Sequence, residues 1–296
     1  MISCAVMSQE RLDASLDIDR HPTLEIVRII EQQDALVAPA VAAEAERIAQ
    51  AVDEIAARLE HGGRLFYAGA GTSGRIAMLD AAELPPTFGT DPSLVRVLMA
   101  GGERAGFAAA EGAEDDEEAA IAAVDREVSP DDALVGIAAS GTTPYTVAAV
   151  RKANMIGALT VGLTSRPGSP LAQEADIAIV PFTGPEVIMG STRMKSGTAQ
   201  KLVLNTLSTA VMIRLGHVHS NLMVDMPATN EKLRDRAVRM VEIAAGVPRT
   251  AAAQAMRESG GNVRLAIVMA ARKIAADEAR ALLAAHRGNL HEVLGT

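Results

Sequence analysis

The stretch from Arg64 to Gly74 reads Arg-Leu-Phe-Tyr-Ala-Gly-Ala-Gly-Thr-Ser-Gly, and it decides the fold. Its first half is a short apolar run, typical of a buried strand, and its second half is a glycine-rich turn before a helical segment. The glycine spacing formally matches a dinucleotide-binding fingerprint. That fingerprint needs a ribose-binding acid about 20 residues further on, and Glu103 comes late. The hydroxyls of Thr72 and Ser73 suit a terminal phosphate better than a pyrophosphate.

A second hydroxyl-rich loop, Ser140-Gly-Thr-Thr-Pro144, follows the apolar run that ends at Ala139 and also opens a helical segment. Loops that follow parallel strands meet at the carboxyl edge of the sheet, where α/β folds bind ligands. Backbone amides and the helix dipole favour an anion at such a place. The two loops together predict a sugar-phosphate site. The alternative is that each loop only caps its helix.

Outward from these loops, short apolar runs alternate with Ala-rich helical stretches. The runs span 95–99, 134–139, 159–163 and 177–180. This alternation predicts an α/β fold in which a parallel sheet carries helices on both faces. We expect a helical N-terminal segment over residues 1–53, a phosphosugar-binding domain over residues 54–217 and a small helical C-terminal domain over residues 218–296.

Two prolines predict the end of the helix that begins at the glycine-rich turn. Pro85 and Pro86 cannot donate backbone hydrogen bonds, so we expect the helix to stop there. Glu83 would then lie at the carboxyl end of the helix, where the dipole favours an uncharged carboxyl group.

Composition excludes several classes of function. The 296 residues carry a net charge of −9, with four Phe, two Tyr and no Trp. A nucleic-acid binder needs a positive field and stacking rings, so no nucleic-acid partner is expected. Cys4 is the single cysteine, which argues against a disulfide framework and a Cys-rich zinc site. His217 and His219 form a His-x-His pair without a third ligand, so no metal is expected.

No run of about 18 apolar residues predicts a membrane span. We therefore expect a cytoplasmic protein without a membrane partner.

Four blocks of sequence, the first of which contains the first loop, lie in order along the chain. They cover 69–75 with 80–86, 111–115, 190–201, and 221–225 with 228–232. The paired loops resemble the sugar isomerase (SIS) domain. The blocks, in this order over nearly the whole chain, resemble the N-acetylmuramic acid 6-phosphate etherase family.

This resemblance implies a carbon–oxygen lyase that uses water to convert N-acetylmuramate 6-phosphate into N-acetylglucosamine 6-phosphate and (R)-lactate, in cell-wall amino sugar recycling and catabolism. In the ring-opened sugar the C1 aldehyde acidifies the C2 hydrogen. A base removes this hydrogen, an acid protonates the departing lactyl oxygen at C3, and water adds to the unsaturated aldehyde. The resemblance implies Glu83 as the acid and Glu114 as the base, a homodimer, and no metal or other cofactor.

The loops and the resemblance together predict a set of substrate- and phosphate-binding residues. They are Gly71, Thr72, Ser73, Gly74, Ser140, Gly141, Thr142, Thr143, Ser191, Arg193 and Lys195. Each polar candidate has a structural alternative. Glu83 would be a surface residue at a helix end, and Glu114 would belong to a solvated acidic helix start. The segment 191–195 would be a capped helix start with charges facing solvent.

Three other functions stay open at this point. A phosphosugar-sensing SIS-domain regulator would keep the loops without needing the carboxyl pair. An aldose–ketose isomerase would need a base near C2 but release no lactate. A dinucleotide-dependent oxidoreductase is supported only by the glycine spacing.

Overall fold

The computed structural model describes residues 11–108 and 110–295. The chain divides into two compact units. The first comprises Met1–Ala81 and Ser93–Val211, and the second comprises Ala82–Pro92 and Met212–Thr296. Cys4, and the expectations that rest on it, lie outside the described residues. Within the described ranges, none of the helices has the length and apolar character needed to cross a membrane.

A five-stranded parallel sheet forms the centre of the first unit. Its strands are β1 (Leu65–Gly69), β2 (Val95–Met99), β3 (Ala133–Ile137), β4 (Leu159–Leu163) and β5 (Ile177–Ile179). Their order across the sheet is β2-β1-β3-β4-β5. Every residue of β1, β3 and β4 is buried. Burial on both faces explains why these strands read as continuous apolar runs, and the predicted parallel sheet is confirmed.

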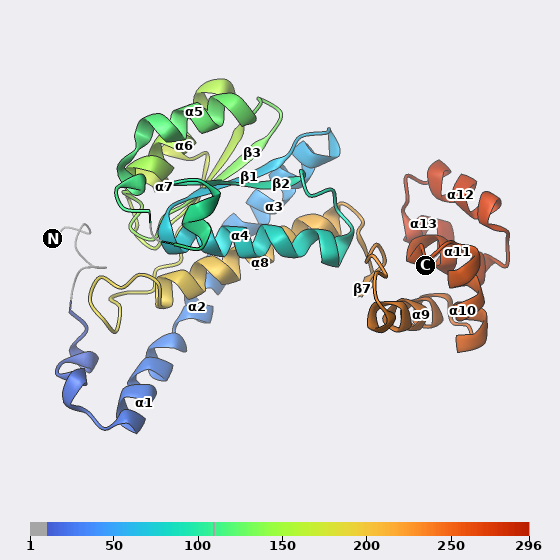
Figure 1. Cartoon of the computed structure of the whole chain (residues 1–296), viewed down its shortest axis with the longest axis horizontal. Helices are drawn as coiled ribbons and strands as arrows, with labels where there is room; N and C mark the ends of the chain where they lie inside the picture. Colours follow the sequence, from blue (N-terminus) through green and yellow to red (C-terminus); the bar gives the residue numbers. More distant parts are fainter. Residues whose placement is uncertain (1–10, 109, 296) are drawn as a thin grey trace. The chain divides into compact units, whose positions relative to one another are not determined.

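Helices cover both faces of this sheet, as predicted (Figure 1). One face carries α5 (Glu117–Glu127), α6 (Pro144–Ile156) and α7 (Pro170–Glu174), and the other carries α3 (Ala45–Glu60), α4 (Gly71–Phe88) and α8 (Lys195–Arg214). Phe66 of β1, Leu134 of β3, Val124 of α5 and Val150 of α6 belong to one buried cluster. This packing holds the carboxyl ends of β1 and β3 in place.

Helix α4 does not end at the two prolines, so that prediction was wrong. The helix includes Pro85 and Pro86 and continues to Phe88, and the backbone N–H of Gly89 donates to the carbonyl of Pro85 at 2.9 Å. A proline ring has a φ that suits a helix, and what it loses is one donor. Leu84 and Phe88 are buried here, and their burial offsets the missing hydrogen bonds. Glu83 therefore lies inside the helix and not at its end.

Within residues 11–44 the structure describes two short 3₁₀ helices and two α-helices. They are η2 (Asp13–Ser15), η3 (Ile18–Arg20), α1 (Thr23–Asp34) and α2 (Val37–Ala42). None of the residues of α1 is buried. Leu24 and Val27 keep 61% and 43% of their surface exposed.

The second unit has its own apolar core. It contains the antiparallel strands β6 (Val218–His219) and β7 (Leu222–Met223), followed by α9 (Glu231–Ala245), α10 (Arg249–Glu258), α11 (Val263–Arg272), α12 (Ala276–Ala285) and α13 (Leu290–Leu294). Met240, Val241, Ile267 and Val293 are among the side chains buried together in this core. The described buried members of this cluster are all aliphatic or Met side chains.

Candidate active site

The carboxyl edge of the sheet has a topological switch beside β1. β1 pairs with β2 on one side and with β3 on the other, and Gly69 at the end of β1 lies opposite Ile137 at the end of β3. The connections after β1 and β3 lead to strands on opposite sides, and open α/β folds have their ligand-binding crevice at such a point. The two hydroxyl-rich loops follow these two strands. They are therefore neighbours at the edge where open α/β sheets bind ligands.

The loop after β1 leads directly into α4. The helix begins at Gly71, whose φ of 54° lies in the left-handed region that favours glycine. Ser73 is buried and Thr72 is half-buried. A Cβ at Gly74 would lie 2.8 Å from the backbone carbonyl oxygen of Gly69 and would also collide with the sulfur of Met99, so glycine is favoured at that position. The positive end of the α4 dipole and its unpaired amides favour an anion here.

The loop after β3 is held by its own hydroxyls. The backbone N–H and the hydroxyl of Thr142 both donate to Ser140 Oγ, at 3.2 and 3.0 Å. Gly141 has a φ of 64°, and a Cβ there would collide with Ser169. Thr143 stands at the N-cap of α6, yet its side chain makes no capping hydrogen bond. Thr143 therefore does not support the alternative that this loop only caps its helix.

A third polar loop at this edge was missed by the sequence reasoning. It follows β4 and includes Thr164, Ser165 and Ser169, all of which are buried. The Thr164 hydroxyl donates to the carbonyl of Ala139 at 3.2 Å. Within the described residues, Ser165 Oγ and Ser169 Oγ have no hydrogen-bond partner. The signal was present in the sequence, because this loop also follows an apolar strand of the parallel sheet.

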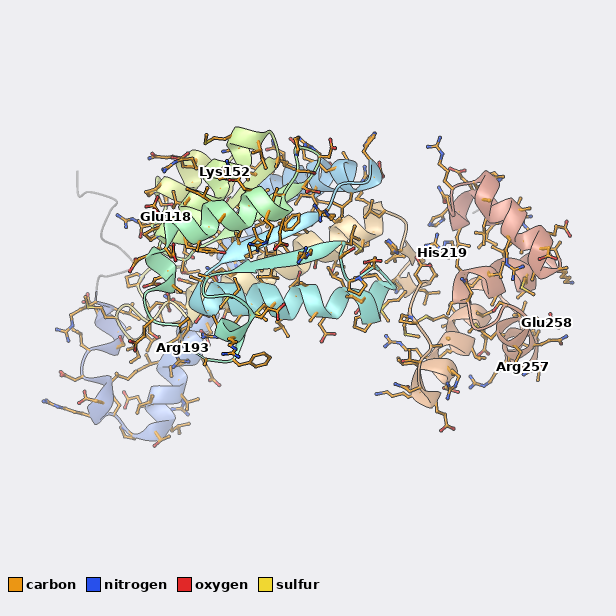
Figure 2. The ribbon with its side chains drawn as sticks, turned by 45° about the horizontal axis from the view of Figure 1, so that its top comes forward. Glu118, Lys152, Arg193, His219, Arg257 and Glu258 are labelled. Atoms are coloured by element: carbon orange, nitrogen blue, oxygen red, sulfur yellow. The ribbon has the colours of Figure 1, made fainter. Side chains whose placement is uncertain are left out.

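The predicted polar cluster before α8 divides into buried and exposed residues. Lys195 keeps 1% of its surface exposed, and its Nζ donates to Gln33 Oε1 of α1 at 2.9 Å. Burial lowers the pKa of Lys195, although the nearby Glu186 opposes that shift. Glu186 also accepts the backbone N–H of Lys195 at 3.0 Å and caps the helix. Ser191 is half-buried and Arg193 is exposed (Figure 2).

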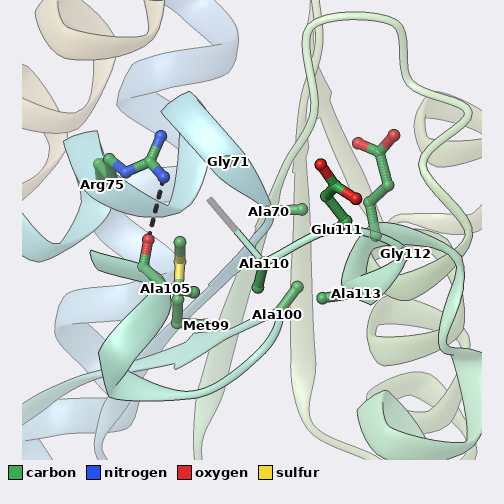
Figure 3. A pocket seen from close by; sticks show the side chains of 11 residues that line it. Ala70, Gly71, Arg75, Met99, Ala100, Ala105, Ala110, Glu111, Gly112 and Ala113 are labelled. Atoms are coloured by element: carbon green, nitrogen blue, oxygen red, sulfur yellow. Dashed lines mark hydrogen bonds between the residues drawn. The ribbon is translucent and has the colours of Figure 1, made fainter. Parts of the chain in front are cut away.

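A pocket of about 350 Å³ opens beside the loop after β1 (Figure 3). Its lining residues are Ala70, Gly71, Arg75, Met99, Ala100, Ala105, Ala110, Glu111, Gly112, Ala113 and Glu114. Glu114 comes from the short helix η5 (Ala113–Asp115), and its neighbour η4 (Glu103–Gly106) supplies another wall. The structure thus brings Gly71 and Glu114, two of the predicted site residues, to one pocket. Arg75 and Glu111 line it as well and were not among the predicted residues.

Glu83 is exposed on α4, twelve residues after Gly71. One turn before it, the buried carboxylate of Asp80 accepts three hydrogen bonds. They come from Tyr67 Oη at 2.9 Å, Asn205 Nδ2 at 2.6 Å and Ser208 Oγ at 3.1 Å. Burial, followed by the charge of Asp80, raises the pKa of Tyr67. This network ties α4 to β1 and α8 just before the helix reaches Glu83.

The His-x-His pair lies in the second unit and has other partners. His217 Nδ1 hydrogen-bonds Asp225 Oδ2 at 2.8 Å, and the ring of His219 lies 4.4 Å from the ring of His291. In the part of the chain that the structure describes, no group of three or more His, Cys, Asp or Glu side chains is placed to hold a metal ion.

Comparison with known proteins shows that the first unit is similar to SIS domains. A model of the glucokinase regulatory protein N-terminal SIS domain matches residues 47–154, and a model of the SIS domain matches residues 107–210. A phosphoheptose isomerase from Francisella tularensis superposes with a TM-score of 0.52 at 21% identity, covering 65% of this chain and 100% of that chain. An E. coli protein in complex with A5P gives a TM-score of 0.50 at 17% identity, covering 68% and 97%. At these identities the likeness shows the fold alone.

Sequence relatives match at much higher identity. The N-acetylmuramic acid 6-phosphate etherase of Symbiobacterium thermophilum is 60% identical over 263 residues, covering 89% of this chain and 88% of that protein. The enzyme of the same name from Clostridium beijerinckii is 49% identical, covering 97% and 95%. The one from Rubrobacter xylanophilus is also 49% identical, covering 98% and 96%. These matches include the second unit as well as the sheet.

Proposed function

The chain belongs to the N-acetylmuramic acid 6-phosphate etherase family, and we propose that it places the substrate's phosphate in the crevice while Glu83 and Glu114 move the protons. As a member of this family it is a carbon–oxygen lyase that cleaves the lactyl ether of N-acetylmuramate 6-phosphate. The regulator alternative is not favoured, because the relatives named as enzymes match nearly the full chain.

The hydroxyl-rich crevice supplies the phosphate site in this proposal. Ser73 and the first amides of α4 come from the loop after β1, and Ser140, Thr142 and Thr143 come from the loop after β3. Both loops stand at helix N-termini, where the dipole and unpaired amides favour anions. A negatively charged phosphate is thereby bound within a protein of net charge −9.

One observation carries the assignment of Glu114. The pocket joins the start of α4, where the phosphate would bind, to the carboxyl group of Glu114. In this proposal the carboxylate of Glu114 removes the C2 proton of the ring-opened sugar. Loss of that proton expels the lactyl oxygen from C3 when an acid protonates it, and Glu83 has that role. Water then adds at C3, a proton returns to C2, and the products are N-acetylglucosamine 6-phosphate and (R)-lactate.

We further propose that the enzyme is a homodimer and that the partner subunit's Glu83 completes each site. Glu83 follows Gly71 by twelve residues on one continuous helix, which corresponds to about 18 Å along the axis of α4. A single hexose phosphate bound at the start of α4 is too short to reach that far. The exposed apolar side chains of Leu24 and Val27 on α1 supply surface that a second copy would cover.

A phosphorylated substrate also supports a cytoplasmic location in this proposal, because a doubly charged phosphate does not cross a lipid bilayer unaided.

The function is tested by incubating the purified protein with N-acetylmuramate 6-phosphate in ¹⁸O-labelled water. We expect equal amounts of lactate and N-acetylglucosamine 6-phosphate, with the label at C3 of the sugar and none in lactate. Label in lactate would contradict elimination followed by hydration. A bound phosphosugar with no lactate released would support the regulator, and a ketose product without lactate would support the isomerase.

A further inference from the structure

The pocket beside Glu114 is lined mainly by small apolar side chains together with a few charged ones. Six of its lining residues are apolar and most are alanine: Ala70, Met99, Ala100, Ala105, Ala110 and Ala113. Its charged lining residues are Arg75, Glu111 and Glu114. Figure 3 places Arg75 on the wall formed by α4 and Glu111 on the opposite wall. Such a pocket suits a small group that has both an apolar part and a negative charge to pair with the guanidinium.

The guanidinium of Arg75 is fixed in place but not saturated. Its Nε donates to the carbonyl of Gly106 at 3.2 Å and its Nη2 donates to the carbonyl of Ala105 at 3.1 Å. An arginine side chain has five N–H donors, so three remain, including both on Nη1. Among the described residues no carboxylate forms an ion pair with Arg75. A half-buried, rigidly held and unpaired cation is well suited to bind a carboxylate.

We propose that Arg75 binds the lactyl carboxylate of the substrate and so determines specificity for N-acetylmuramate 6-phosphate over its lactate-free product. The inference rests on the proposed function. Glu114 acts at C2, the lactyl group is attached at the adjacent C3, and Arg75 lines the same pocket as Glu114. The alanine side chains would contact the lactyl methyl group. Without Arg75, the carboxylate would face Glu111 and Glu114 with no positive charge nearby.

Two other substrate groups compete for this pocket, and their chemistry separates them. The N-acetyl group at C2 is neutral, so it gains nothing from an unpaired guanidinium. The phosphate is anionic, but the hydroxyl-rich crevice already supplies donors for it. Both groups are present in N-acetylglucosamine 6-phosphate, whereas the lactyl carboxylate is absent from it. Binding of that product therefore separates the lactyl carboxylate from the other two groups.

The first test measures lactate release and product inhibition for Arg75→Gln, which removes the charge but can keep a donor to the η4 carbonyls. We expect kcat/KM for N-acetylmuramate 6-phosphate to fall on the order of 10- to 100-fold, the range of a charged hydrogen bond. The inhibition constant of N-acetylglucosamine 6-phosphate should stay within about twofold. Arg104→Gln removes an exposed arginine of η4 that does not line the pocket, and it should leave both values unchanged.

Equal weakening of substrate and product binding would overturn the assignment and favour the phosphate or the N-acetyl group. An unchanged kcat/KM would also overturn it. If the wild-type enzyme releases no lactate at all, the proposed function itself fails. Lactate release by the wild type, with Arg75→Gln indistinguishable from it, would remove only the role of Arg75.

A second measurement needs no variant to fold. The substrate analogue whose lactyl carboxylate is converted to a primary amide removes the same charge from the other partner. We expect the wild type to process this amide on the order of 10- to 100-fold less efficiently. Arg75→Gln should process the amide and the acid with similar efficiency. The loss caused by the substitution and the loss caused by the amide should not add, because the substitution has already removed the interaction. A wild-type enzyme that cleaves the amide as fast as the acid would contradict the proposal.

Discussion

At the scale of single residues, Asp132 shows how one buried carboxylate fixes the sheet at the edge opposite the site. It precedes β3 and accepts hydrogen bonds from the backbone N–H groups of Arg64 and Ser129, both at 2.7 Å. It also pairs with the Arg64 guanidinium at 3.0 Å. Burial alone would raise the pKa of Asp132, but the hydrogen bonds from Ser129 and Arg64 outweigh it and hold the pKa below its usual value.

Asp132→Asn should therefore lower the free energy of unfolding by about 3 kcal/mol at pH 7, because it leaves donors without a charged acceptor. Because the pKa of Asp132 is lower in the folded state, its carboxylate contributes fully to the free energy of unfolding at any pH above the unfolded-state pKa. This contribution is lost as the pH falls through the folded-state pKa. Urea denaturation of both proteins should give a constant difference from about pH 7 to 5 that shrinks below about pH 4.

The kinetics of lactate release separate a structural role from a catalytic one. Asp132→Asn should keep the wild-type kcat, because Asp132 lies at the amino end of the strands. A stability difference that grows on acidification would contradict the assigned direction of the pKa.

The sequence predicted which residues lie at the edge of the sheet more readily than it predicted what surrounds each side chain. The hydroxyls of Ser73 and Ser140 lie at the predicted edge, because strand ends and glycines are visible in the sequence. The substrate-binding role of Lys195 stays a prediction, but its environment was not predicted: its side chain is buried and its Nζ donates to Gln33 of α1. A residue far away in the sequence decides that burial, so no local pattern reveals it. Arg75 was missed for the same reason, because the pocket exists only once η4 and η5 fold beside α4.

At the scale of elements, the strands were predictable and the end of α4 was not. The buried strands are apolar throughout, which leaves a clear signal. The two prolines carried an equally clear local signal for helix termination, and tertiary packing overrode it. Burial of Leu84 and Phe88 on either side of the prolines supplies the opposing free energy.

Pro86→Ala should stabilise the protein, because it lets residue 86 donate to the carbonyl of Ala82. Pro86 is exposed, so the change leaves no cavity. The gain from a restored helical hydrogen bond exceeds the entropy that proline removes from the unfolded chain, and we expect about 1 kcal/mol in calorimetry. Pro167→Ala, at an exposed loop proline, gains no such bond and is the matched control. Equal effects of the two substitutions would contradict this account of α4.

At the scale of the whole molecule, we propose that two chains contribute residues to each site. About 18 Å of helix separates Gly71 from Glu83. Sequence comparison could suggest both glutamates, but it could not say which chain supplies each. The distance along α4 supplies the physical reason to assign them to different subunits.

Hybrid dimers test this assignment. Glu83→Gln and Glu114→Gln homodimers should each be inactive. In a hybrid dimer, the Glu83→Gln chain keeps Glu114 and the Glu114→Gln chain keeps Glu83. If Glu83 acts on the partner's pocket, these two intact glutamates meet in one of the two sites. Mixed and reassociated samples should then recover up to about a quarter of wild-type lactate release, since half the dimers are hybrids with one working site. If each site takes both glutamates from one chain, mixing restores nothing.

The most direct measurement of the central claim is lactate release from N-acetylmuramate 6-phosphate by the wild type and by Glu83→Gln, with phosphosugar binding measured on the same samples. We predict lactate from the wild type, a loss of at least about 100-fold in kcat for Glu83→Gln, and unchanged binding, because an acid that protonates the departing oxygen acts in the transition state. Full lactate release by Glu83→Gln, or phosphosugar binding by the wild type without any lactate, would contradict the claim.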